Sequence, residues 1–317
     1  MTAPRYIDRK TGQEMTEKVY GKFYIDLLYG TSWFSHLLSF LVLPVFSHIN
    51  FLSRLYGEIQ KSRLSKKKIK PFIEKFHVDT SEFLDPVDSF QSFNDFFIRK
   101  LKPSARPIVM ANDIAILPAD GRYLVYENIE KTDGFFVKGK KFSLEKLLRS
   151  SELAQKYALG AMAIARLAPV DYHRFHFPAS CLPEDPQLIN GPLFSVNPAA
   201  LKKHAEILAE NKRVITPLKT KNFGTILFIE VGATYVGSIH QTFDPHEPHA
   251  KGDEKGYFSF GGSSLILLFE PARIRFDQDL IDASNRRIEV LGLMGQSLGK
   301  ALVAKYATGN TVEIKWT

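Results

Sequence analysis

The chain has 317 residues and a mass of 36.0 kDa, enough for two domains or for one large domain with an appendage. Hydrophobic residues make up 44% of the sequence and charged residues 24%, which excludes a largely disordered chain. The single cysteine, Cys181, excludes a disulfide framework and cysteine-rich zinc modules, and the net charge of +8 favours an anionic partner.

The first twenty residues are polar and mixed in charge. They contain no positively charged start that leads into an apolar core and a small-residue cleavage site, so we expect no secretory signal. A reducing compartment agrees with the lone cysteine. The sequence therefore predicts a protein at a cytoplasmic face.

The N-terminal third is predicted to be helical, because apolar residues recur at helical spacing and β-branched runs are few. The spaced apolar positions are Phe23, Leu27, Leu28, Leu37, Leu38, Leu41, Phe51, Leu52 and Leu55. Within this third, Trp33–Phe51 is strongly apolar but is interrupted by His36, Pro44, His48 and Asn50. Its clean part is shorter than the roughly 20 residues that a spanning helix needs. We therefore predict a segment that lies in a membrane surface.

A cluster of basic residues follows this apolar segment. Its members are Lys61, Arg63, Lys66, Lys67, Lys68 and Lys70. Anionic headgroups attract such residues by about 1 kcal/mol per charge near the surface. The alternative is a buried helical hairpin with a solvated lysine face, but an apolar and a basic segment in tandem favour membrane contact.

The sequence pattern changes from helical to β-rich near residue 105. Ser92 is predicted to cap a short helix with a phenylalanine-rich face, which Pro103 and Pro107 stop. We expect a helical membrane-associating region over residues 1–105 and a β-rich catalytic domain over residues 106–317. The predicted fold class is thus α+β.

Short strands separated by turn residues are predicted in the second region. They are Ile114–Leu117, Tyr123–Tyr126, Ile226–Val231, Thr234–Ile239, Leu265–Phe269 and Thr311–Trp316. Helices are predicted at Leu144–Leu148, behind the cap Ser143, and at Ala199–Ala209, behind Pro198.

Two glycines and two serines, Gly261 to Ser264, precede the apolar strand LILLF. Glycines there permit close approach and unusual backbone geometry. Taken alone, the four residues favour a glycine bulge at the start of a strand. A serine-hydrolase elbow is a poor match, because G-x-S-x-G would need glycine in place of Leu265.

The segment DYHRFHFP places two histidines, His173 and His176, three residues apart with Arg174 between them. This pattern favours a base or an anion site over a metal site, because no cysteine or helically spaced acid accompanies it. Asp120 lies in the turn PADG, where an aspartate usually bonds its own backbone. Three further histidines, at positions 240, 246 and 249, are expected to be loop residues and not ligands.

In this order, these elements resemble the phosphatidylserine decarboxylase family. The segments that carry the resemblance are SFNDFFIRKLKPSARPI, PADG, KGKKFSLEKLL, DYHRFHFP, GPLFSVN, NKRVI, VGATYVGSI and KGDEKGYFSFGGSSLILLF. Together they span nearly all of the chain from Ser92 to Phe269, and residues 262–264 match the G-S-S form of the family's processing site.

The resemblance implies a proenzyme that makes its own cofactor. Ser263 would attack the carbonyl of Gly262 and then become a pyruvoyl group, giving chains 1–262 and 263–317. Asp120, His176 and Ser263 match the family's processing relay, in which the acid orients the imidazole that takes the hydroxyl proton. The pyruvoyl group would form a Schiff base with the substrate amine, and His173 is expected to help decarboxylation. No metal is expected.

The implied substrate is phosphatidylserine, which would be decarboxylated to phosphatidylethanolamine. The basic charge fits an anionic lipid surface, so the protein is expected to be peripheral on the cytoplasmic face of the cell membrane, without a nucleic-acid partner. Homo-oligomerisation stays open. The alternatives are a pyruvoyl decarboxylase of a soluble amino acid and a non-catalytic basic membrane-binding protein.

Overall fold

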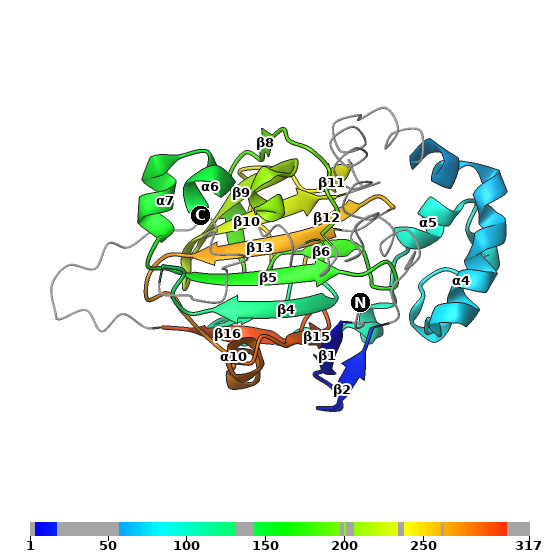
Figure 1. Ribbon diagram of the computed structural model, residues 1–317, viewed down its shortest axis with the longest axis horizontal. Helices are drawn as coiled ribbons and strands as arrows, with labels where there is room; N and C mark the ends of the chain where they lie inside the picture. Colours follow the sequence, from blue (N-terminus) through cyan, green and yellow to red (C-terminus); the bar gives the residue numbers. More distant parts are fainter. Residues whose placement is uncertain are drawn as a thin grey trace, which may run out of the picture.

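The computed structural model describes residues 4–17, 57–130, 143–196, 200, 206–233, 238–260 and 263–302. Within these ranges the fold is α+β and rich in strands, as predicted, and its centre is a ten-stranded sheet (Figure 1). Across this sheet the strands are β2 (Glu14–Thr16), β1 (Arg5–Asp8), β15 (Glu289–Gly292), β4 (Gly121–Tyr126), β5 (Ala161–Leu167), β13 (Ser263–Phe269), β10 (Gly224–Gly232), β9 (Arg213–Thr220) and β7 (Cys181–Pro183), with β8 (Gln187–Ile189) also paired to β9.

Two smaller sheets and several short helices accompany the large sheet. One small sheet has the order β11 (Ile239–Gln241), β12 (Glu254–Phe258), β6 (Arg174–His176), and the other has the order β14 (Ile274–Phe276), β16 (Ser297–Ala301), β3 (Ile114–Ile116). The α-helices are α4 (Ile69–Phe76), α5 (Phe93–Phe97), α6 (Leu144–Leu148), α7 (Ser151–Tyr157), α9 (Ile207–Glu210) and α10 (Gln278–Asn285). Short 3-10 helices span Arg63–Lys68, Thr80–Glu82, Val87–Ser89 and Pro103–Ala105.

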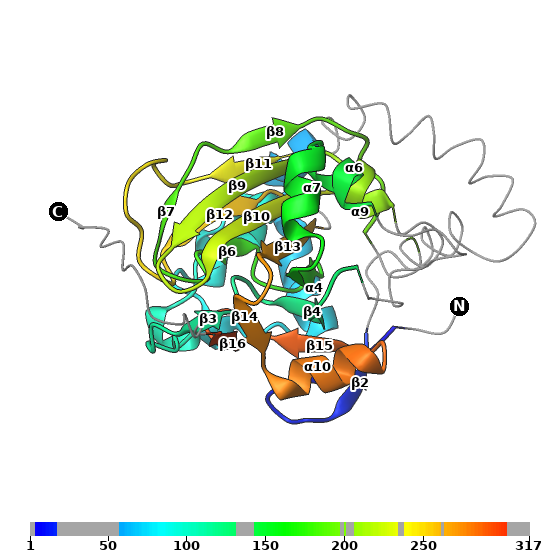
Figure 2. The same cartoon turned by 90° about the vertical axis from the view of Figure 1, so that its left-hand side faces the viewer.

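The central strands β5, β13 and β10 are buried on both faces, which explains their almost continuous apolar sequences. Along β13, Leu265 and Leu267 join a core formed with the small sheets and α10, whereas Ile266 and Leu268 face the helices α6, α7 and α9. Figure 2 shows α7 beside this second face. The large sheet is therefore the middle layer of the protein.

A third apolar cluster belongs to the segment around α4 and α5. Its buried members are Ile69, Phe72, Phe83, Phe90, Phe93, Phe96, Phe97 and Phe260. Phe260 comes from the segment that leads into β13, so this cluster joins the helical segment to the central sheet. Figure 1 shows α4 and α5 at one end of the sheet, opposite α6 and α7.

Local signals in the sequence predicted several of these elements correctly. The Ser92 hydroxyl accepts a hydrogen bond from the amide of Asp95 at the start of α5, and Ser143 accepts one from Lys146 at the start of α6. The predicted strands at residues 114–117, 123–126, 226–231 and 265–269 correspond to β3, β4, β10 and β13.

Residues 4–17 differ from the predicted helical region, because they form a hairpin that extends the large sheet. The strand β1 runs parallel to β15, with Tyr6 opposite Glu289, and β2 returns antiparallel to β1. Gly12 lies in the turn with a φ of +70°, a conformation that glycine adopts readily. Pairing with a distant strand therefore decides the structure here, and periodicity within the segment does not.

Several predictions fall on residues outside the described ranges. These are the apolar segment Trp33–Phe51, the strand Thr311–Trp316, most of the strand at residues 234–239 and the first part of the helix at residues 199–209. In the part of the chain that is described, no helix is long and apolar enough to cross a membrane. The helical membrane-contacting region and the division at residue 105 stay predictions.

Candidate functional site

Ser263 is the first residue of β13 and lies at the end of the sheet next to α5. It pairs with Gly232 of β10 on one side and with Leu167 of β5 on the other. Because side chains alternate along a strand, its hydroxyl faces the same layer as Leu265. The residue is 0% exposed. The two preceding glycines, including Gly262 of the predicted cleavage site, are outside the described residues.

Among the residues that the structure describes, His173 is the histidine in contact with Ser263. Its Nδ1 lies 3.5 Å from the Ser263 Oγ, and its Nε2 lies 3.0 Å from the carbonyl oxygen of Ala168. A carbonyl oxygen only accepts hydrogen bonds, so Nε2 carries the proton and the Nδ1 lone pair faces the serine hydroxyl. This tautomer suits a general base.

The environment of His173 keeps the ring neutral. The ring is fully buried and stacks on Phe97 with 3.8 Å between ring centroids. Burial lowers the pKa of His173 well below its usual value, and the nearby positive charge of Arg99 lowers the pKa further. A neutral imidazole is the form that accepts a proton.

His176 is held by two other groups. Its Nδ1 lies 2.9 Å from the carbonyl oxygen of Gly252, so Nδ1 donates, and its Nε2 lies 3.2 Å from the hydroxyl oxygen of Tyr172. Burial lowers the pKa of His176, while the hydrogen bond to Gly252 and the charges of Glu254 and Asp120 act in the opposite direction. The described residues place Ser263 against His173 and not against His176.

Asp120 is buried and does not bond its own backbone as a turn aspartate often does. Its carboxylate accepts hydrogen bonds from Nε and Nη2 of Arg106 at 2.6–3.1 Å and from the amide of Met294 at 2.9 Å. It acts on His176 through its charge and makes no direct hydrogen bond to either histidine among the described atoms. The predicted relay of Asp120, His176 and Ser263 is therefore not assembled by contact and stays a prediction.

Several charged residues that the sequence analysis did not single out surround this site. Arg122 forms a buried ion pair with Asp171, whose Oδ2 also accepts the amide of Ala168 at 2.6 Å. Arg99 donates from Nη2 to the carbonyl oxygens of Val170 and Asp171 at 3.0 and 3.3 Å. These bonds brace the loop that carries His173. Arg99 lies in the segment SFNDFFIRKLKPSARPI of the family resemblance, which was the signal that could have identified it, whereas Arg122 directly follows the PADG segment.

The histidines at positions 240, 246 and 249 do not bond one another, and His240 lies in the strand β11 and not in a loop as expected, because it pairs with Tyr257 of β12. His240 contacts the Ser259 hydroxyl, His246 contacts the Asp185 carboxylate, and His249 contacts the carbonyl oxygen of Asp244. Among the described residues, no group of three histidine, cysteine or acidic side chains could hold a metal ion.

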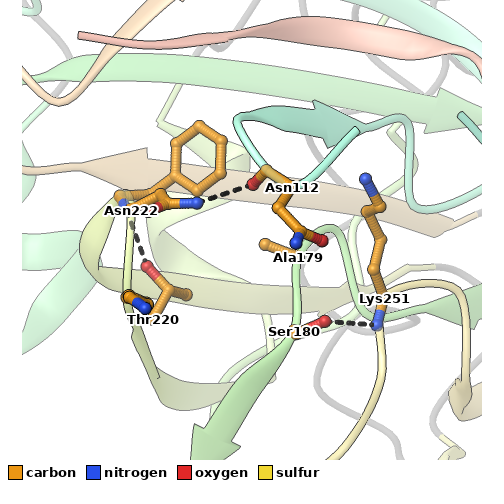
Figure 3. Close-up of a pocket in the computed structure, with 8 residues that line it drawn as sticks. Asn112, Ala179, Ser180, Thr220, Asn222 and Lys251 are labelled. Carbon is orange, nitrogen blue, oxygen red and sulfur yellow. Dashed lines mark hydrogen bonds between the residues drawn. The ribbon is translucent and has the colours of Figure 1, made fainter. Parts of the chain in front are cut away.

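A cavity of about 360 Å³ lies away from this site (Figure 3). It is bordered by the turn between β9 and β10 and by Asn112, Ser180 and Lys251. Thr220 and Gly224 pair at this end of β10, whereas Ser263 pairs with Gly232 at the other end, roughly 25 Å along the strand. This cavity therefore does not serve chemistry at Ser263.

Comparisons with known proteins identify the family of this chain. A model of the phosphatidylserine decarboxylase family matches residues 93–300. Proteins named phosphatidylserine decarboxylase proenzyme from Chlamydia pneumoniae and Chlamydia caviae are 49% and 50% identical to the chain, covering 95% and 94% of it and 98% of each relative. One from Chlamydia muridarum is 49% identical over 93% of the chain and 96% of its own length. The chain belongs to the phosphatidylserine decarboxylase family.

Proposed function

We propose that the protein is a self-processing phosphatidylserine decarboxylase that cleaves its own chain between Gly262 and Ser263. The observation that carries the proposal is the buried Ser263 hydroxyl, which faces the unprotonated nitrogen of a neutral imidazole at the start of a strand. A serine hydroxyl is a weak nucleophile, and an adjacent base activates it. The family match supports the same chemistry.

The proposed cleavage proceeds through an ester, followed by elimination and hydrolysis, and needs no oxidant or reductant. The Ser263 Oγ attacks the Gly262 carbonyl carbon while the imidazole takes the hydroxyl proton, and the C–N bond then breaks to leave an ester. A base removes the Ser263 Cα proton, and the Gly262 carboxylate leaves as a double bond forms between Cα and Cβ. Tautomerisation and hydrolysis by one water release ammonia and leave a pyruvoyl group at position 263. The contact between His173 and the Ser263 hydroxyl suits the first of these steps.

The residues present fit a pyruvoyl group at position 263. The buried side chain of Ser263 leaves little water around the group, and the bonded loop of His173 holds an imidazole beside it. The pyruvoyl group supplies an electron sink, because its carbonyl condenses with the substrate amine and accepts the electrons of the bond that releases carbon dioxide. The chain's own contribution is to exclude water and to hold a proton on an imidazole.

The two histidines have different support for the role of base. The contact with Ser263 favours His173, and the resemblance to the family favours His176. In the arrangement described here, the unprotonated nitrogen of His176 faces the Tyr172 hydroxyl. His176 would have to give up this hydrogen bond before it could serve Ser263, so the geometry supports His173 as the base in the uncut chain.

Intact mass of freshly made protein tests the processing. The expected result is two fragments, one ending at Gly262 and one beginning at a pyruvoyl group, and Ser263→Ala should stay uncut. Ser284→Ala is a matched control, because this buried hydroxyl bonds the amide of Val125, away from the site. An uncut wild-type chain would support the non-catalytic alternative, and faster turnover of free serine than of phosphatidylserine would support a soluble substrate.

We also propose that the protein binds the surface of an anionic membrane, as a peripheral protein on the cytoplasmic face. The segment from residue 58 to residue 76 carries the predicted basic cluster and two exposed apolar side chains, Leu64 and Ile59, which are 79% and 49% exposed. Exposed apolar side chains among lysines favour an interface that combines apolar burial with charge attraction.

Vesicle flotation tests the membrane proposal. Binding should strengthen with phosphatidylserine content and weaken with salt, because mobile ions screen the attraction between exposed charges. A Leu64→Ser, Lys67→Glu variant should bind less than the wild type. Lys221→Glu is the control, since this exposed lysine lies at the distant turn between β9 and β10. Equal loss of binding in both variants would contradict the proposed surface.

A further inference from the structure

The chain that leads into the predicted cleavage site is fixed by α5. The amide of Phe260 donates a hydrogen bond to the Asn94 Oδ1 at 2.9 Å. The Phe260 ring packs edge-on against Phe93 and Phe97, with ring centroids 5.1 and 4.9 Å apart. Phe260 stands two residues before Gly262. One short helix therefore holds the backbone and the side chain just ahead of the scissile bond.

The same segment also fixes the base. Phe97, at the end of α5, stacks on His173 with centroids 3.8 Å apart and an interplanar angle of 22°. Arg99, two residues later, bonds the carbonyl oxygens of Val170 and Asp171, three and two residues before His173. The segment from residue 93 to residue 99 thus contacts both sides of the reaction, the chain before the scissile bond and the imidazole beside Ser263.

The Asn94 side chain has no capping role in α5. The helix start is capped by Ser92, whose hydroxyl accepts the amide of Asp95, and the Asp95 carboxylate accepts the amide of Gln91. Asparagine is also among the less favourable residues inside a helix. The hydrogen bond to Phe260 is therefore the contact that gives this side chain a function.

Anchoring matters here because self-cleavage needs the reacting groups in a defined geometry. Two glycines, the most permissive residues, separate Phe260 from Ser263. The attack requires the Ser263 Oγ and the Gly262 carbonyl carbon to be held about 3–3.5 Å apart in the correct direction. The hydrogen bond of Phe260 and the strand pairs of Ser263 fix the residues on either side of these two glycines.

We propose that Asn94 and Phe97 are positioning residues for self-cleavage, so that α5 completes the processing site by orienting Phe260 and His173. This inference rests on the proposed cleavage between Gly262 and Ser263. It gives the segment before residue 105 a direct part in making the cofactor, in addition to the proposed membrane contact.

The test follows cleavage of freshly synthesised full chain with variants of α5. Asn94→Ala removes the acceptor for the Phe260 amide and should slow cleavage about 10- to 100-fold, as expected for a misplacement near 1 Å. Asn94→Asp keeps an acceptor oxygen and should restore cleavage to within a few-fold of the wild type. Asp95→Ala is the matched control, because it loses a bond to Gln91 in the same helix without touching Phe260.

Hydroxylamine separates positioning from general damage. It attacks the ester carbonyl of Gly262, forms a hydroxamate there and releases Ser263 with its hydroxyl restored, so it cleaves only chains that have already formed the ester. Hydroxylamine should not accelerate cleavage of Asn94→Ala, because the ester itself forms slowly. Cleavage of this variant at the wild-type rate with hydroxylamine would place the defect in the later elimination and overturn the proposal.

Thermal melting of the uncut chains completes the comparison. If Asn94→Ala and Asp95→Ala lose the same stability and slow cleavage equally, the effect is structural and the proposal is overturned. If Asn94→Ala cleaves as fast as the wild type, the proposal also fails, while the proposed cleavage stands. A wild-type chain that never cleaves would instead refute the proposed function.

Discussion

The pH dependence of self-cleavage identifies the base. An ordinary histidine, with a pKa near 6.5, would be only about 9% neutral at pH 5.5, so a rate that depends on it would fall about tenfold. Burial, followed by the charges of Arg99 and Arg122, lowers the pKa of His173, and only the hydrogen bond to Ala168 acts in the opposite direction. We therefore expect the cleavage rate to fall by much less than tenfold between pH 7.5 and pH 5.5.

Burial also lowers the pKa of His176, so the pH profile of the wild type does not distinguish the two histidines. Two substitutions then show which of them is the base. Arg99 acts on His173 and is not among the groups that shift His176, so Arg99→Gln should move the acid limb of the profile to higher pH if His173 is the base. Glu254 raises the pKa of His176, so Glu254→Gln should move the limb to lower pH only if His176 is the base. Because the two substitutions move the acid limb in opposite directions, the profiles show whether His173 or His176 is the base.

The assay uses chain made in a cell-free reaction, exchanged rapidly into buffers from pH 5.0 to pH 8.5 and sampled on denaturing gels. Circular dichroism at each pH serves as the control for folding. It is needed because a histidine that is buried and neutral charges on unfolding, which lowers stability by up to about 1.4 kcal/mol for each pH unit below 6.5. If the cleavage rate fell tenfold around pH 6.5 while the fold stayed intact, neither buried histidine could be the base.

Replacing each histidine by alanine in the same assay identifies the base independently. Loss of a general base slows proton transfer by roughly 10²–10⁴-fold, which is about 3–5 kcal/mol in the barrier. We expect this loss for His173→Ala, on the basis of its contact with Ser263. Normal cleavage by His173→Ala together with failure of His176→Ala would instead support the assignment that the family resemblance implies.

Three further predictions concern buried charge and salt. Asp120→Asn should slow cleavage and lower the free energy of unfolding measured in urea by about 3–5 kcal/mol, because Arg106 loses its closest buried counter-charge. Lys255→Met should cost a similar amount, since it leaves Glu230 fully buried without the ammonium 2.5 Å away, whereas the double variant with Glu230→Leu should recover much of the loss. Flotation on phosphatidylserine vesicles should decrease from low to high salt, and salt-independent retention would indicate deep apolar insertion.

The sequence alone was sufficient for features that depend on neighbouring residues. Ser92 and Ser143 were recognised as helix caps because a cap bonds an amide only three residues away. The strand that begins at Ser263 was recognised from its apolar run, since a strand between two layers needs apolar residues on both faces. The ordered family segments also located Asp120, His173 and His176, which all lie in buried positions.

Only the tertiary structure decided which of these residues meet. Ser263 lies 90 positions from His173, and Met294 lies 174 positions from Asp120, so local patterns carry no information about either contact. The hairpin at residues 4–17 depends in the same way on β15, near the other end of the chain. Strand pairing and burial select such partners, because they depend on how distant segments pack together, whereas caps and periodicity depend on residues within a few positions of each other.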